Sequence, residues 1–207
     1  GRIDCLVNNA GYAQFGPLED VPVESVHRQF DANVYGPHRL TRAVLPHMRR
    51  RRDGTIVNVS SVAGRVAFPG GGAYCGSKFA LEAMSDALRA EVQGKGIDVV
   101  VVEPGPVRSG FRDRAEREIT ADGETPAAER SGAYDRFYEL FEDARLVGGD
   151  GPGSIAPERV ADDVVNAASA TKPRARYRTG TVARLGVLGR FVPDAMRDAA
   201  FSLLERL

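Results

Sequence analysis

The stretch Tyr74-Cys-Gly-Ser-Lys78, with Ser61 thirteen residues before the tyrosine, is the most informative part of this chain. Tyr74 and Lys78 are four residues apart, so on a helix both side chains emerge from one face, one turn apart. A phenol with a pKa of about 10 is a poor base at neutral pH, and an adjacent ammonium favours the phenolate. The spacing therefore predicts a pair of residues that donates and accepts protons.

Ser61 follows a short apolar run, residues 55–59, that predicts a strand. A hydroxyl at the carboxyl end of that strand could hydrogen-bond the substrate oxygen that Tyr74 protonates. The alternative for Ser61 is a structural one, a hydrogen-bonding cap at the strand end. A Tyr-x-x-x-Lys pair alone is common on exposed helices, so this prediction needs the support of the rest of the sequence.

Apolar runs alternate with amphipathic helical patterns along the first half of the chain. Residues 3–7, 55–59 and 98–103 predict strands, and residues 22–52 and 73–92 predict helices. This alternation is typical of parallel strands joined by right-handed helical crossovers.

Pro37 lies within the first predicted helix and should bend it, because proline removes an intrahelical donor. A bend beside Asn33 could free backbone groups to bind water. The alternative is that Asn33 is merely a surface amide.

The second half of the chain has a different composition. Residues 108–157 combine charged, aromatic and glycine-rich segments and predict a mobile cover over the active site. A helix is expected from Pro157 to about Ala170, and an edge strand over residues 177–183. The tail, residues 185–207, is amphipathic and broken by Pro193, and we expect it to pack over the substrate opening or against another subunit rather than on a membrane.

The composition is that of a soluble globular protein with one core. Hydrophobic residues make up 43% and charged residues 27% of the 207, which favours a single domain over residues 1–207. Twenty-eight basic residues balance twenty-eight acidic ones, so no overall field favours nucleic acid. No apolar run reaches the roughly 18 residues that span a bilayer, and no signal peptide pattern is present.

The two cysteines, Cys5 and Cys75, fit a reduced cytoplasm better than a disulfide framework. No zinc-type spacing of ligands is found, and His27, His38 and His47 do not cluster as ligands would, so no metal is expected. We therefore expect a cytoplasmic protein.

Several further blocks stand in a fixed order around Tyr74 and Lys78. They are Cys5-Leu-Val-Asn-Asn-Ala-Gly11, Asn33-Val-Tyr-Gly36, Gly54-Thr-Ile-Val-Asn-Val-Ser-Ser61 and Glu103-Pro-Gly-Pro-Val-Arg-Ser109. Together they resemble the classical short-chain dehydrogenase/reductase family, in wording most of all the branch of 17-beta-hydroxysteroid and retinol dehydrogenases. The resemblance implies an α/β fold: the carboxyl-terminal portion of a Rossmann-type, doubly wound parallel sheet in three layers, lacking the first strands.

The resemblance also implies an NAD(P)-dependent oxidoreductase that acts on a ketone or secondary alcohol, with an apolar substrate favoured. In this family Tyr74 would exchange the proton on the substrate oxygen, Ser61 would polarise the carbonyl, and Asn33 would anchor a water molecule. Lys78 would keep the pKa of the tyrosine low and bind the nicotinamide ribose. The cofactor, NADP slightly favoured over NAD, would contact Tyr74 and Lys78 and also Asn9, Ala10, Gly11, Pro104, Gly105, Val107 and Ser109.

Relatives in this family carry a glycine-rich Thr-Gly-x-x-x-Gly-x-Gly turn before their fourth strand, and this chain starts immediately before that strand. We therefore expect the strand near Val7 to expose an unpaired edge, and the 207-residue chain to bind dinucleotide poorly. The complete protein is expected to be a homo-oligomer that acts on a small molecule. The alternative is a truncated, non-catalytic remnant or interaction module that cannot bind dinucleotide.

Overall fold

Four parallel strands form the sheet in the computed structural model, which describes residues 1–110, 131–143, 151 and 153–204. The strands are β1 (Cys5–Asn8), β2 (Gly54–Val59), β3 (Ile97–Pro104) and β4 (Arg176–Thr179), and they pair in chain order. The register aligns Val7 with Val57 and Val57 with Val100. The carboxyl ends of all four strands therefore lie at one edge of the sheet, where ligands bind in open α/β folds.

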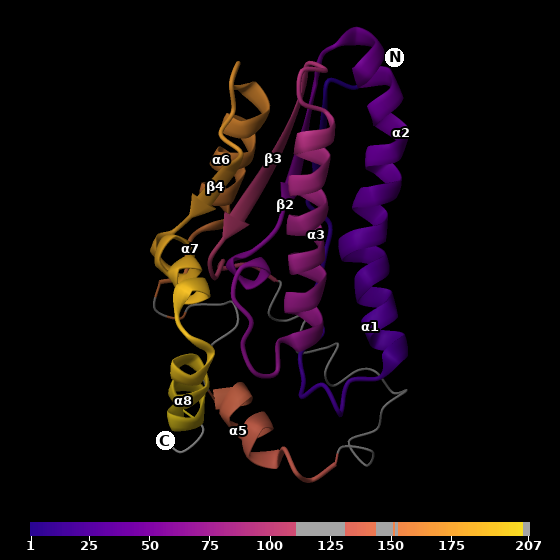
Figure 1. Ribbon diagram of the computed structural model, residues 1–207. Coiled ribbons are helices and arrows are strands. Elements are labelled where there is room, and N and C mark those ends of the chain that lie inside the picture. Colours follow the sequence, from indigo (N-terminus) through magenta and orange to yellow (C-terminus); the bar gives the residue numbers. More distant parts are fainter. Residues whose placement is uncertain (111–130, 144–150, 152, 205–207) are drawn as a thin grey trace.

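Helices cover both faces of this sheet (Figure 1). On one face lie α2 (Gly36–Arg51) and α3 (Gly72–Glu91), and on the other lies α6 (Pro157–Ser169). Met48 and Ile56 are fully buried in the core beneath α2, and Val100 and Ala167 are buried in the core beneath α6. The predicted three-layer α/β fold is confirmed.

The long helical stretch predicted over residues 22–52 is divided by an irregular turn. It consists of α1 (Val23–Phe30), a π-helical turn (Asp31–Tyr35) and α2. The N–H of Gly36 donates to the carbonyl of Asp31, five residues earlier. Pro37 follows at the start of α2 and has no N–H to offer the carbonyl of Asn33 four residues before it, which explains why the regular helix is interrupted here.

The strand predicted over residues 177–183 is wrong beyond Thr179. Gly180 has a φ of +91°, which leaves the extended conformation, and a side chain at this position would lie 2.9 Å from Ile155. The chain turns there into α7 (Thr181–Gly186).

The tail continues as a 3-10 helix (Val187–Phe191) and α8 (Asp194–Leu204), with the predicted break at Pro193. No helix among the described residues combines the length and apolarity needed to cross a bilayer. In the described sheet β1 is an edge strand, and Val7 is 41% exposed.

The predicted cover is described only in part, because residues 111–130 and 144–150 lie outside the described residues. Its described helix, α5 (Asp135–Asp143), lies beyond the carboxyl ends of the strands (Figure 1). Two tyrosines tie this part of the chain to the loop after β1. Tyr134 Oη donates to Glu19 at 2.8 Å, and Tyr138 Oη donates to Asp20 at 3.0 Å.

Candidate active site

A cavity of about 480 Å³ opens at the carboxyl ends of β2 and β3. Its volume is in the range of sites that hold small molecules and cofactors. Nine of the residues predicted for the site line it: Asn9, Gly11, Ser61, Tyr74, Lys78, Pro104, Gly105, Val107 and Ser109. Ala10 and Asn33 are not among the lining residues. The sequence blocks therefore meet at one place although they come from four separate segments of the chain.

Tyr74 lies in the first turn of α3 and is 8% exposed. Burial raises the pKa of its phenol to about 12, and a hydrogen bond with Ser61 opposes this rise. The buried position penalises the phenolate more than the hydrogen bond with Ser61 stabilises it. The expectation that Lys78 lowers this pKa stays a prediction. Tyr74 is accordingly a neutral phenol across the physiological pH range, able to donate a proton.

Lys78 lies one turn further along α3 and is also buried. Its Nζ donates a hydrogen bond of 2.9 Å to the carbonyl of Val59 at the end of β2, and lies 5.9 Å from the centroid of the Tyr74 ring. Burial lowers the pKa of Lys78 to about 8, and the charge of Glu82 opposes this shift. The ammonium is therefore held at the cavity wall, with a pKa of about 8.

Ser61 is a structural cap, as one interpretation of its position predicts, and its hydroxyl also lines the cavity, where the other interpretation places the substrate. It is the N-cap of a 3-10 turn (Val62–Gly64), and its Oγ accepts a hydrogen bond from the N–H of Ala63 at 3.1 Å. The same hydroxyl lines the cavity and pairs with Tyr74. The cap thus fixes the hydroxyl beside the phenol.

Asn33 lies in the π-helical turn and is 1% exposed, so it is not a surface amide. Its Oδ1 accepts from the N–H of Tyr12 at 3.1 Å, while its Nδ2 donates to the carbonyl of Tyr12 and to Ser77 Oγ. A side chain at Gly11 would lie 2.8 Å from Asn33 Oδ1 and 3.7 Å from Lys78 Nζ. Asn33 therefore holds the loop after β1 against α3, close behind the lysine.

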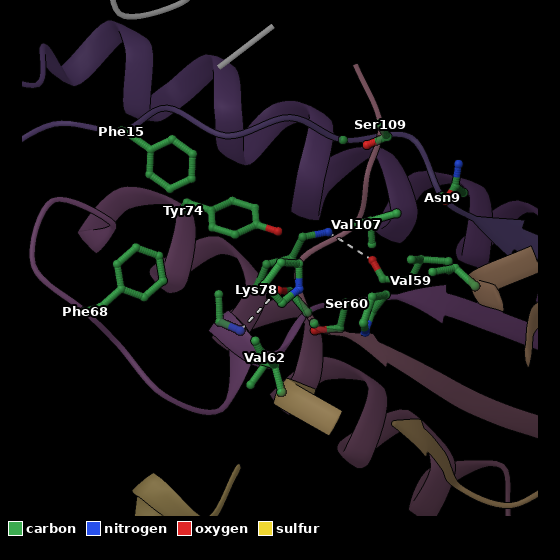
Figure 2. A pocket seen from close by; sticks show the side chains of 18 residues that line it. Asn9, Phe15, Val59, Ser60, Val62, Phe68, Tyr74, Lys78, Val107 and Ser109 are labelled. Carbon is green, nitrogen blue, oxygen red and sulfur yellow. Dashed lines mark hydrogen bonds between the residues drawn. The ribbon is translucent and has the colours of Figure 1, made fainter. Parts of the chain in front are cut away.

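Aromatic residues that the sequence did not single out form one wall of the cavity. Phe15 and Phe68 line it together with Tyr74, and the ring of Phe15 lies 5.6 Å from that of Tyr74 and 6.3 Å from that of Phe68. Figure 2 shows these three rings on one side of the cavity and Asn9 and Ser109 on the other. Phe15 lies in the loop after β1 and Phe68 in the loop after β2. These positions were the available signal that the two rings belong to the site, because such loops meet at the carboxyl edge of a parallel sheet.

Comparison with known proteins gives consistent matches. The sequence model of the short chain dehydrogenases matches residues 1–120. An uncharacterized oxidoreductase of Escherichia coli K12, YbbO, is 38% identical over 194 residues, which are 93% of this chain and 65% of that protein. Human retinol dehydrogenase 8 is 36% identical over 187 residues, which are 86% of this chain and 57% of that protein. The chain thus spans about two thirds or less of the length of these relatives.

Solved structures show the same similarity. A short-chain dehydrogenase from Streptomyces avermitilis is 32% identical and superposes with a TM-score of 0.72, covering 100% of this chain and 71% of that one. A serine dehydrogenase in complex with NADP+ is 27% identical with a TM-score of 0.66, covering 87% of this chain and 65% of that one.

Proposed function

Because the chain belongs to the short chain dehydrogenase family, we propose that the protein is an NAD(P)-dependent oxidoreductase that interconverts a ketone and a secondary alcohol. The observation that carries this proposal is the meeting of Tyr74, Ser61 and Lys78 at one cavity. A proton donor, a hydroxyl that contacts it and a cation are the groups needed to manage a proton on a substrate oxygen.

In this proposal Tyr74 is the proton donor for carbonyl reduction. A neutral phenol is the form that can donate, and burial keeps Tyr74 in that form. Ser61 fixes the position of the phenol oxygen and provides a second hydrogen bond for the substrate oxygen. Lys78 stabilises the negative charge that Tyr74 acquires when it gives up its proton, because its ammonium lies next to the ring.

The residues of the cavity fit the nicotinamide end of a dinucleotide. The wall formed by Pro104, Gly105 and Val107 is suited to a flat ring, and Lys78 Nζ offers a donor to ribose hydroxyls. A bound nicotinamide supplies the hydride that goes to the carbonyl carbon, or accepts it in the reverse direction. Asn9 and Gly11, which also line the cavity, would hold the adenosine side. We favour NADP over NAD because the serine dehydrogenase structure is a complex with NADP+.

The aromatic wall of the cavity favours an apolar substrate. Phe15 and Phe68 present aromatic rings beside Tyr74, and Val62 and Val182 add further apolar surface. Such a surface gains free energy by removing apolar groups from water. The similarity to retinol dehydrogenase 8 agrees with a substrate of this kind.

Replacement of Tyr74 by phenylalanine in the full-length protein tests the proposal. We expect Tyr74→Phe to lower kcat by at least 10²-fold, since general acid catalysis contributes about 10²- to 10⁴-fold, and to leave NADPH affinity nearly unchanged. Tyr35→Phe is the matched control, because Tyr35 is 41% exposed and lies outside the cavity.

Turnover retained in Tyr74→Phe would remove tyrosine from the mechanism. A wild-type protein that neither binds NADPH nor turns over any carbonyl substrate would instead support the alternative of a non-catalytic interaction module. NADPH titration of the wild type by fluorescence separates these two outcomes.

A further inference from the structure

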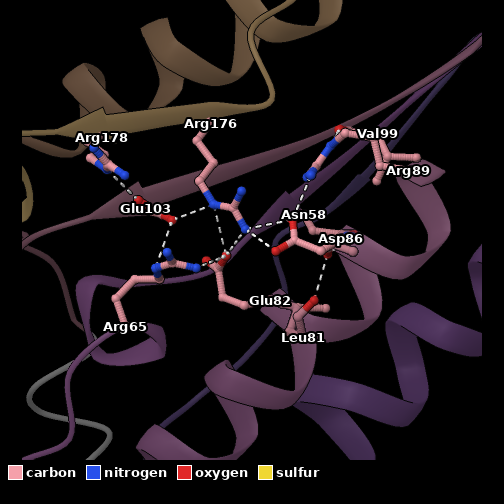
Figure 3. A network of polar contacts seen from close by, with 11 residues as sticks. Asn58, Arg65, Leu81, Glu82, Asp86, Arg89, Val99, Glu103, Arg176 and Arg178 are labelled. Atoms are coloured by element: carbon pink, nitrogen blue, oxygen red, sulfur yellow. Dashed lines mark hydrogen bonds and ion pairs between the residues drawn. The ribbon is translucent and has the colours of Figure 1, made fainter. Parts of the chain in front are cut away.

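A cluster of charged side chains joins α3 to β3 and β4 (Figure 3). At its centre Arg176, from β4, contacts three carboxylates. Its Nε donates to Glu103 at 2.9 Å, and its Nη2 donates to Glu82 at 3.0 Å and to Asp86 at 2.7 Å. One guanidinium therefore joins the edge strand, the central strand and the catalytic helix.

The two innermost carboxylates are almost fully inaccessible to solvent. Glu103 is 0% and Glu82 is 3% exposed. A buried carboxylate is costly unless cations and donors compensate it. Arg178 donates to Glu103 at 3.0 Å, and Arg65 lies 3.8 Å from both carboxylates. Three guanidinium groups therefore surround the two buried carboxylates. The contacts of Arg176 and Arg65 with Glu82 fix the position of its side chain.

Glu82 stands one helical turn after Lys78, as Lys78 stands one turn after Tyr74. Residues with this spacing are neighbours on one helix face. The turn after β2 packs against the same face, because a side chain at Gly64 would lie 3.0 Å from both Glu82 Cγ and the carbonyl of Lys78. Lys78 and Glu82 are both buried, so the charge of Glu82 acts on Lys78 through the protein interior, where it raises the pKa of the lysine.

We propose that Glu82, held by Arg176, is a positioning residue that keeps Lys78 charged and seated against the carbonyl of Val59. The consequence for turnover rests on the proposed function, whereas the effect of Glu82 on the ionisation of Lys78 does not. In this arrangement the β4 edge strand reaches the active site through Arg176, Glu82 and Lys78. A change in β4 is thereby transmitted to the lysine although β4 contributes no residue to the cavity lining.

Other charged and titratable side chains lie around Lys78 and Glu82. They are Tyr74 and Asp86 from α3, Arg65 from the segment after the 3-10 turn, Glu103 from β3, and Arg176 and Arg178 from β4. Burial and the neighbouring Glu103 raise the pKa of Glu82, while a hydrogen bond from Arg176 lowers it. Arg176 thus favours the ionised form of Glu82 at the pH where Lys78 titrates.

Direct titration of Lys78 by NMR tests the proposal without any measurement of activity. The chain contains only three lysines, Lys78, Lys95 and Lys172, so [13C]lysine labelling gives a spectrum in which a Lys78→Arg variant identifies the signal. We expect the titration midpoint of Lys78 to fall by about one pH unit in Glu82→Gln, because a nearby opposite charge shifts a pKa by about one to three units. Lys95 and Lys172, both exposed, should not move.

Two variants separate this role from a merely structural one. Glu82→Asp keeps the carboxylate and should restore most of the midpoint. Asp86→Asn removes another partner of Arg176 that lies two turns from Lys78, and should shift the midpoint much less. An unchanged midpoint in folded Glu82→Gln, or equal shifts in Glu82→Gln and Asp86→Asn, would overturn the proposal.

The wild type provides a measurement that does not depend on the folding of any variant. If Glu82 acts on Lys78, the Lys78 signal must show a second, smaller inflection as Glu82 titrates, because coupled groups report each other's ionisation. A Lys78 signal with a single inflection over the whole acid-to-alkaline titration would refute the coupling. Loss of turnover in Tyr74→Phe is independent of either result, so failure of this proposal and failure of the proposed function are distinguishable.

Discussion

Asn33 holds both backbone polar groups of Tyr12. Its Oδ1 accepts from the Tyr12 N–H at 3.1 Å and its Nδ2 donates to the Tyr12 carbonyl at 2.9 Å. Tyr12 is 7% exposed and belongs to no strand or helix, so this amide satisfies buried backbone groups that no regular element pairs. The π-helical turn thus fixes the loop that passes Lys78.

Replacement of Asn33 by alanine should lower the free energy of unfolding by about 2 to 4 kcal/mol, because it removes three buried hydrogen bonds to Tyr12 and Ser77, each contributing about 0.5 to 1.5 kcal/mol. Urea denaturation followed by circular dichroism measures the change. Asn166→Ala on α6 is the control, because Asn166 is exposed, and it should change stability by less than about 0.5 kcal/mol. Equal losses in the two variants would show that Asn33 is not a structural clasp.

The shifted pKa values of Lys78 and Tyr74 predict an unusual dependence of stability on pH. Below pH 8 Lys78 is protonated in both states and contributes no slope. Between its folded pKa of about 8 and its unfolded value of 10.5 the unfolded chain binds more protons, so stability rises with pH, by about 3 kcal/mol in total. Between 10 and about 12 the folded state keeps the Tyr74 proton that the unfolded state loses, so stability falls again.

Chemical denaturation at several pH values checks this prediction against two variants. Lys78→Met should lack the rise between pH 8 and 10, and Tyr74→Phe should lack the fall above pH 10. If Lys78→Met and the wild type have the same slope between pH 8 and 10, Lys78 does not titrate near 8.

The sequence predicted the layers and the meeting of Tyr74, Lys78 and Ser61 because those depend on local periodicity and on the common edge at which parallel strands end. It did not predict the depth at which Tyr74 is buried. The i, i+4 spacing is the same on an exposed and on a buried helix, and the rings of Phe15 and Phe68, which help to bury Tyr74, come from distant loops.

Long-range partners were likewise hidden. Asn33 bonds Tyr12, twenty-one residues earlier, and Arg176 bonds Glu82, ninety-four residues earlier. No periodic pattern specifies such pairs. The end of β4 was missed for a different reason: the residues after Gly180 suit a strand, and the positive φ of this glycine decides the direction of the chain.

The cluster around Arg176 predicts a large loss of stability in Arg176→Met. This substitution leaves Glu103 and Glu82 buried without their main cation, and breaking a buried pair costs about 3 to 5 kcal/mol. Arg197→Met is the matched control, because Arg197 pairs with Asp194, whose side chain is 84% exposed. An exposed pair of this kind contributes about 0 to 1 kcal/mol. Thermal unfolding of the two variants measures these losses of stability. Equal losses would contradict the buried character of the Arg176 cluster.

Gly70→Ala should detach α5 from the body of the domain. Gly70 has a φ of +71°, and a methyl group there would lie 1.9 Å from the ring of Phe137, which comes from α5. Gly94 has a φ of +74° with nothing within 4 Å, so Gly94→Ala imposes the same backbone strain, about 1 kcal/mol, without the clash. The difference between the two variants therefore isolates the contact with α5.

Hydrogen exchange measured by mass spectrometry on residues 131–139 reports the result. Gly70→Ala should lose protection in this segment, while Gly94→Ala should keep it and lose only global stability. Tyr134 and Tyr138 belong to the same segment as Phe137 and donate hydrogen bonds to Glu19 and Asp20. These two hydrogen bonds should be lost together with the contact of Phe137. Unchanged protection in Gly70→Ala would mean that the hydrogen bonds to Glu19 and Asp20 suffice to hold this segment, and that Phe137 does not need the space which the glycine leaves.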